Sequence, residues 1–93
     1  MYPKISIVTT NFNGGKFLER TIQSVIGQQY PNLEYIIIDG QSTDNSIEII
    51  RKYESHLHYW ISEPDNGMYE ALQKGLEKCT GDIMAWINSD DMY

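Results

Sequence analysis

Long apolar runs and paired cysteines are both missing from this sequence. No stretch approaches the roughly 20 apolar residues that a membrane span requires, and residues 1–4 lead into a strand-like run without a signal-peptide pattern. The single cysteine, Cys79, excludes an internal disulfide and fits a reducing compartment. We therefore expect a cytoplasmic location for this segment.

Positive charge is also scarce. Seven lysines and arginines stand against 13 aspartates and glutamates, which gives a net charge of −6. A groove for DNA or RNA needs an excess of positive charge, so no nucleic-acid partner is expected. No Walker motif and no G-x-G-x-x-G follows a predicted strand, which argues against a glycine loop that cradles phosphate. An acidic site can still bind a nucleotide diphosphate if a divalent cation lies between them.

What is present is the composition and periodicity of one α/β domain over residues 1–93. The chain is 41% hydrophobic and 22% charged, as in globular proteins. Four apolar runs alternate with three helical patterns, and this β-α-β-α-β-α-β order predicts a Rossmann-like parallel sheet with right-handed crossovers. The expected strands are Lys4–Thr10, Leu33–Asp39, His56–Ser62 and Asp82–Ile87; the expected helices are Lys16–Gln29, a segment from after Asn45 to about Glu54 with Ile47, Ile50 and Tyr53 inward, and Met68–Lys78.

Polar and acidic clusters follow the ends of the predicted strands. They are Asn11–Asn13, Asp39, Glu63–Asp65 and Asp90–Asp91. In an open parallel sheet, ligands bind in the crevice beyond the carboxyl ends of the strands. The clusters therefore predict a nucleotide site with a metal.

The adjacent carboxylates Asp90 and Asp91 are the sharpest signal. They can offer oxygen ligands to Mg²⁺ or Mn²⁺, with substrate phosphates completing the shell. The alternative is a solvated turn. Asp39 can accept hydrogen bonds from a base or ribose, or it can cap the following helix. Phe12 can stack on a base or belong to the core, and Glu63–Asp65 can contact a ligand or solvent.

Four segments carry a resemblance to a known family. They are Ile5–Asn13 (ISIVTTNFN), Ile37–Asp44 (IIDGQSTD), Ser62–Ala71 (SEPDNGMYEA) and Gly81–Asp91 (GDIMAWINSDD). Together they resemble the amino-terminal half of a family-2 glycosyltransferase of the GT-A fold, particularly bacterial members that build surface polysaccharides. The similarity runs in order over nearly the whole chain.

The resemblance implies a nucleoside-diphosphate-sugar site, most often for a UDP-sugar. Phe12 is then expected against the base, Asp39 at the base edge, and Asp90 facing the ribose or sugar. Asp91 is expected to bind the Mn²⁺ or Mg²⁺ that bridges the diphosphate. The residues implied for the nucleotide are Thr10, Asn11, Phe12, Asn13, Asp39, Asp65 and Asp90, and those implied for the metal are Asp90 and Asp91.

The resemblance also implies a reaction. Family members transfer the sugar with inversion to a glycan or lipid-linked acceptor, using a carboxylate base to deprotonate the acceptor hydroxyl. Two departures weaken individual contacts: Gly40 stands where many members have a second acid, and Leu72-Gln73 replaces a frequent Arg-Asn pair.

The length of the chain sets a further expectation. In the family, the acceptor-binding half and the catalytic base follow the metal motif, whereas this chain ends two residues beyond Asp91. We expect a fragment truncated after the metal motif, which binds the donor but holds no catalytic residue and is inactive alone. We expect the full enzyme to work in the cytoplasm. The inner face of the membrane is the alternative location, because many relatives use lipid-linked acceptors.

Two other functions fit parts of the pattern. One is a receiver-like signalling domain with acids around Mg²⁺, although such domains place an aspartate after the first strand, where this chain has Asn11 and Asn13. The other is a non-catalytic nucleotide-binding module whose acids only cap helices.

Overall fold

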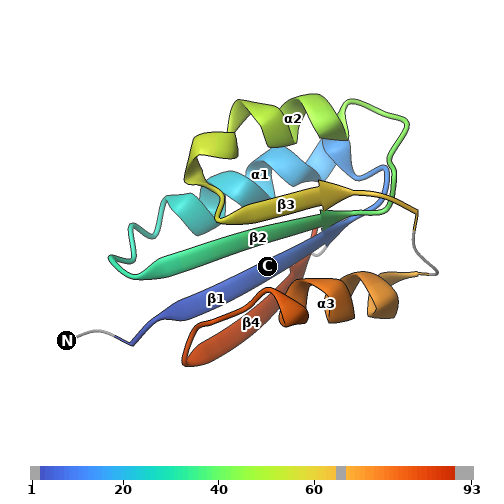
Figure 1. Ribbon diagram of the computed structural model, residues 1–93. Coiled ribbons are helices and arrows are strands. Elements are labelled where there is room, and N and C mark those ends of the chain that lie inside the picture. The colour runs from blue at the N-terminus through green and yellow to red at the C-terminus, as the bar shows by residue number, and fades with distance from the viewer. Residues whose placement is uncertain (1–2, 65–66, 90–93) are drawn as a thin grey trace.

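The computed structural model describes residues 3–64 and 67–89. These residues form a parallel sheet with the strand order β3-β2-β1-β4 and with helices on both faces (Figure 1). The predicted α/β class and the predicted order of elements are confirmed. The elements are β1 (Ile5–Asn11), α1 (Gly15–Ile26), β2 (Leu33–Asp39), α2 (Ser46–Lys52), the 3₁₀ turn η1 (Glu54–His56), β3 (Tyr59–Ser62), α3 (Met68–Glu77) and β4 (Ile83–Asn88).

The central strand β2 explains why the sequence has three consecutive isoleucines. Successive side chains of a strand point to opposite faces. Ile37 packs in the cluster beneath α1 and α2, whereas Ile36 and Ile38 pack against α3. All three are fully buried. Both faces of the sheet are therefore covered, as in other parallel α/β sheets.

Several boundaries differ from the sequence prediction. The third strand begins at Tyr59 rather than His56, because residues 54–56 form a 3₁₀ turn. Helix α1 ends at Ile26, where the N–H of Gly27 bonds to the carbonyl of Gln23 at 2.8 Å. The predicted inner face of α2 was right for Ile50, which is fully buried, and for Tyr53, which packs against the same cluster, but it missed Ile49. Ile49 joins Ile50 in the core, Ile47 is only half-buried, and Tyr53 follows the last helical residue.

The strand order reverses beside β1. From β1 the chain runs to β2 and β3 on one side, and it then crosses back to place β4 on the other side of β1. The connections after β1 and before β4 therefore lead away from the gap between these two strands in opposite directions. Their ends are joined where the N–H of Ser89 donates to the carbonyl of Thr10 at 3.0 Å. Such a reversal leaves a crevice at the carboxyl ends of the strands, which is where open α/β sheets bind ligands.

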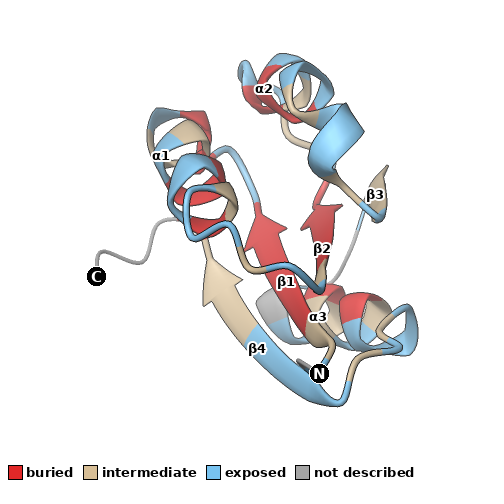
Figure 2. Cartoon of the chain, turned by 90° about the vertical axis from the view of Figure 1, so that its left-hand side faces the viewer, coloured by how far each residue is buried: buried red, intermediate tan, exposed pale blue. Residues whose placement is uncertain are grey.

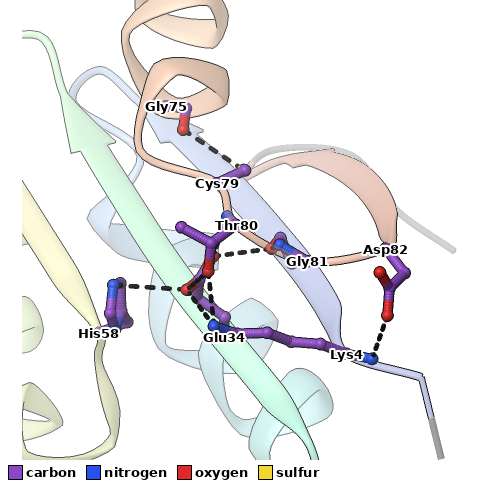
Figure 3. A network of polar contacts seen from close by, with 9 residues as sticks. Lys4, Glu34, His58, Gly75, Cys79, Thr80, Gly81 and Asp82 are labelled. Carbon is purple, nitrogen blue, oxygen red and sulfur yellow. Dashed lines mark hydrogen bonds and ion pairs between the residues drawn. The ribbon is translucent and has the colours of Figure 1, made fainter.

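A buried carboxylate, Glu34, ties the opposite edge of the sheet together (Figure 3). Its Oε1 accepts hydrogen bonds from the Ser6 hydroxyl (2.7 Å) and the Thr80 N–H (2.8 Å). Its Oε2 lies 3.0 Å from the Lys4 ammonium and 3.4 Å from His58 Nε2, and also accepts from the Thr80 hydroxyl at 2.7 Å. Burial alone would raise the pKa of Glu34, but the bonds from Thr80, Ser6 and Lys4 lower it to about 2.

The edge strand β4 is the least covered part of the sheet. Figure 2 shows its first half exposed beside the buried β1 and β2. Ile83 is 49% exposed and Met84 is 57% exposed. None of the helices in the described part of the chain has the length and apolar character that a membrane span needs.

Candidate functional site

A pocket of about 610 Å³ opens at the reversal point of the sheet. Its walls come from the end of β1, the first turn of α1, the start of α3 and the end of β4. This is the edge at which the sequence predicted a ligand site. The lining residues are Thr10, Asn11, Phe12, Asn13, Gly14, Lys16, Phe17, Gly40, Gly67, Ala71, Asn88 and Ser89.

Asn11 connects three strands at the floor of the pocket. Its Nδ2 donates to Asp39 Oδ1 on β2 at 2.7 Å, and its Oδ1 accepts from the Ser89 hydroxyl after β4 at 2.6 Å. Next to it, the Thr10 hydroxyl accepts from Trp86 Nε1 at 3.0 Å. Because both residues are almost fully buried, these bonds hold the ends of β2, β1 and β4 in a single arrangement.

Asp39 does not reach the pocket surface. The side chain is fully buried, and besides Asn11 it accepts bonds from the Ser42 N–H (2.8 Å), the Ser42 hydroxyl (2.6 Å) and the Ser62 hydroxyl (2.8 Å). Its neighbour Gly40 lines the pocket instead. The observed role of Asp39 is thus to shape the loop after β2 and to hold Asn11. A direct contact with a nucleobase stays a prediction.

The loop after β1 leaves one aromatic ring free. Asn13 adopts a left-handed conformation with φ of 50°. Its N–H donates to the Ser42 hydroxyl at 2.8 Å, and its Oδ1 accepts from the Thr43 N–H at 2.7 Å. Between these anchored positions, Phe12 lies in the pocket wall and is 68% exposed. An exposed ring on a fixed loop is suited to stacking against a planar group.

Gly14 allows the pocket walls to approach closely. A Cβ atom there would lie 2.5 Å from both Asn11 Oδ1 and Ser89 Oγ. Helix α1 begins directly after it, and the Gly15 N–H donates to Asp44 Oδ2 at 2.9 Å. Partial burial would raise the pKa of Asp44, but bonds from Ser46 and Gly15 hold this pKa below its usual range. The carboxylate is therefore charged at neutral pH and stabilises the helix start.

The structure brings together Thr10, Asn11, Phe12 and Asn13 as the sequence predicted. It also adds residues that the prediction missed, notably Lys16, Phe17, Asn88 and Ser89. Lys16 and Phe17 stand directly after the glycine turn that follows β1, and Asn88-Ser89 directly precedes Asp90. Adjacency to the predicted clusters was the only signal for them.

The expected metal ligands Asp90 and Asp91 lie outside the described residues, as does Asp65. Within residues 3–64 and 67–89, no three His, Cys, Asp or Glu side chains gather closely enough to hold a metal ion. Glu63 does not line the pocket, and its carboxylate lies 3.0 Å from the Lys74 ammonium. The two carboxylates directly after the β4 wall have the oxygen donors that Mg²⁺ and Mn²⁺ prefer.

Sequence comparison places this site in a known family. The family model described as glycosyl transferase family 2 matches residues 6–93. The chain belongs to glycosyl transferase family 2. The resemblance inferred from the four segments is confirmed, and the match includes every residue of the pocket.

Two relatives illustrate the extent of the similarity. An uncharacterized glycosyltransferase of Mycobacterium tuberculosis is 37% identical over 92 residues, covering 98% of this chain and 35% of that protein. The putative teichuronic acid biosynthesis glycosyltransferase TuaG of Bacillus subtilis is 34% identical over 94 residues, covering 98% of this chain and 37% of TuaG. The chain thus spans little more than a third of these relatives.

Solved structures confirm the GT-A fold. A mannosyltransferase from Pyrobaculum calidifontis, solved with GDP-Man and Mn²⁺, superposes with a TM-score of 0.87 at 23% identity, covering 100% of this chain and 29% of that one. Glucosyl-3-phosphoglycerate synthase from Mycobacterium tuberculosis, solved with Mn²⁺, UDP and glucosyl-3-phosphoglycerate, gives a TM-score of 0.76 at 30% identity, covering 95% and 34%.

Proposed function

We propose that this chain binds a nucleoside-diphosphate sugar, specifically a UDP-sugar, as the donor part of a glycosyltransferase. The observation that carries the proposal is the pocket at the ends of β1 and β4, which presents the exposed Phe12 ring beside buried amide and hydroxyl groups. The UDP bound to glucosyl-3-phosphoglycerate synthase, which is 30% identical, supports the choice of nucleotide.

In this proposal each pocket residue has a distinct task. Phe12 stacks against the base. Thr10, Asn11 and Asn13 line the nucleoside part of the pocket, while Asp39 fixes Asn11 and the loop that carries Gly40. The nucleotide therefore meets a wall that is already held in place by hydrogen bonds, which reduces the entropy lost on binding.

Asp90 and Asp91 are proposed to hold a divalent cation, Mn²⁺ or Mg²⁺. The cation supplies positive charge that offsets the negative charge of the departing diphosphate. Mn²⁺ in the solved structure of glucosyl-3-phosphoglycerate synthase supports this assignment. Asp65, which follows β3 in the sequence, is also proposed to contact the nucleotide.

For the whole protein we propose inverting transfer of the sugar to a glycan or lipid-linked acceptor, in the cytoplasm at the inner face of the membrane. The similarity to TuaG, the putative teichuronic acid biosynthesis glycosyltransferase, supports a part in polysaccharide synthesis. We propose no catalytic base within residues 1–93.

Calorimetric titration of the folded chain with UDP, GDP and dTDP, each with and without Mn²⁺, tests the donor site. We expect one nucleotide to bind, and to bind more tightly with Mn²⁺. Asp91→Asn should remove the metal dependence, because an amide is a weaker ligand for a hard cation than a carboxylate. Glu77→Gln, at an exposed residue of α3 outside the pocket, serves as the charge-matched control and should leave it intact.

Two outcomes contradict parts of the proposal. If no nucleotide binds to a sample with a cooperative unfolding transition, the donor site is wrong. If UDP binds equally with and without Mn²⁺, or if Asp91→Asn behaves as wild type, the donor site stands and the metal assignment is lost.

A further inference from the structure

Lys16 is the one charged side chain among the described residues that line the pocket. It lies in the first turn of α1, next to Phe17, and is exposed. The other lining residues in the described part of the chain are neutral, so any anionic group that enters this pocket meets Lys16 as its nearest positive partner on that wall.

Three of the other four lysines in the described part of the chain form ion pairs, whereas Lys16, like Lys78, contacts only an aromatic ring. The ammonium groups of Lys4, Lys52 and Lys74 lie 2.7–3.0 Å from glutamate carboxylates. Lys16 forms no ion pair with any described carboxylate, and its Nζ lies 5.6 Å from the centroid of the Phe17 ring. An exposed contact of this kind is weak and leaves the ammonium able to bind a ligand.

The position of Lys16 is also unfavourable for the helix itself. A positive charge in the first turn is repelled by the helix dipole, and α1 has no acidic residue of its own in that turn; the Asp44 carboxylate, which accepts from the Gly15 N–H, offsets part of this repulsion. The protein as a whole carries an excess of acids. Lys16 forms no ion pair with Asp44 or with any other described carboxylate, so its ammonium is left for an anionic ligand.

We propose that Lys16 pairs with the diphosphate of the donor nucleotide; this inference rests on the donor site proposed above. The base is assigned to the Phe12 ring, which leaves the charged part of the ligand for the ammonium. Gly14 brings the start of α1 against Ser89, and Ser89 directly precedes Asp90 and Asp91. Lys16 thus lines the pocket where the start of α1 approaches Ser89, and in this proposal it shares the neutralisation of the diphosphate with the cation. A compact, strongly hydrated ammonium suits phosphate as a point charge.

The test compares binding of a nucleotide with binding of its nucleoside. Wild type, Lys16→Ala and Arg51→Ala are titrated in Mn²⁺ with the tightest binder among UDP, GDP and dTDP, and with the matching nucleoside. Arg51 is exposed on α2, outside the pocket and in no ion pair with a described carboxylate, so its substitution removes the same charge elsewhere.

We expect Lys16→Ala to weaken the diphosphate about three- to tenfold while nucleoside affinity stays within about twofold of wild type. Arg51→Ala should change neither affinity, and Lys16→Arg should retain most of the diphosphate affinity. The loss in Lys16→Ala should shrink at high salt, because exposed charges are screened.

The inference is overturned if Lys16→Ala weakens nucleotide and nucleoside by the same factor, or weakens neither. In both cases the wild type still binds, so the donor site survives. If wild type binds no nucleotide at all, the donor site and the role of Lys16 fail together.

Discussion

At the scale of single residues, the two buried carboxylates of the sheet have structural tasks at opposite edges. Glu34 joins β1, β2 and the turn before β4 at the amino edge, and Asp39 organises the loop at the carboxyl edge. Hydrogen bonds stabilise the charged form of a buried carboxylate. Removing those partners, or the charge itself, therefore lowers the free energy of unfolding.

Glu34 should make stability depend on acid. Its pKa is about 2 in the folded chain, against 4.5 for the free side chain. The stabilisation is therefore complete above pH 4.5 and is lost as the pH falls through 2. A shift of this size corresponds to about 3 kcal/mol of unfolding free energy. Glu34→Gln should lose an amount of this order at pH 7 in urea denaturation, and should show a flatter dependence on pH between 4.5 and 2.

Glu77→Gln is the control for this experiment, since Glu77 is exposed and such surface changes usually fall within about 0.5 kcal/mol. Equal losses in the Glu34 and Glu77 variants, or an unchanged pH profile in Glu34→Gln, would show that the network at the amino edge contributes little.

At the scale of elements, the two faces of the sheet differ in how firmly they hold their helices. Among the residues that the structure describes, the cluster beneath α1 and α2 has eight buried members, whereas the cluster beneath α3 has four, Val8, Ile36, Ile38 and Ala71. Fewer buried apolar contacts mean a smaller free energy for local opening. Helix α3 should therefore be the more loosely attached layer.

Hydrogen exchange measured by mass spectrometry tests this difference. We expect amides of α3 to exchange faster than those of α1. Ile38→Ala should accelerate exchange chiefly in α3, because Ile38 faces that helix. Ile37→Ala, one residue away and equally buried, faces α1 and α2 and should act there; each substitution should cost about 2–4 kcal/mol. Equal protection of α1 and α3 would contradict the prediction.

The sequence was a good guide to elements whose signal is local. The run Ile36–Ile38 predicted a strand covered on both faces, and the two glycines after Asn13 predicted the turn into α1. Periodicity alone could not orient α2, since in a seven-residue helix both Ile47 and Ile49 fit an apolar face near Ile50. The start of β3 was also missed. Residues 56–58 alternate between polar and apolar as in a strand, but residues 54–56 form a 3₁₀ turn, and the strand begins only at Tyr59.

The pocket was predictable only in part. Phe12 and its neighbours follow a strand directly, so their placement depends on local sequence. The partners of Asn11 are 28 and 78 residues away, and such pairings follow from strand order, which no local pattern encodes. For this reason the burial of Asp39 and its bond to Asn11, and the bond between Asn11 and Ser89, emerged only from the structure.

At the scale of the whole molecule, the edge strand β4 is the part of the described sheet most able to associate with other chains. Ile83 and Met84 are large apolar side chains exposed on an edge strand, and such edges pair readily with other chains. Sedimentation velocity should detect self-association of this chain at high concentration. Met84→Lys should reduce it, while leaving the urea midpoint nearly unchanged because the side chain is 57% exposed.

A matched control is Gln73→Lys, which adds the same charge at an exposed position of α3. If both variants reduce association equally, net charge rather than the β4 edge governs it. If Met84→Lys associates like wild type, the edge is not the contact.

The bond between Asn11 and Ser89 also bears on folding kinetics. It joins residues 78 apart, and closing so long a loop carries an entropic cost that grows with the logarithm of its length. Contacts of this separation slow folding, so the pocket floor should be among the last parts to assemble. A ligand that binds the finished pocket stabilises only chains in which β4 has docked. The rate at which nucleotide binding appears during refolding would then report the rate of the final folding step, the docking of β4.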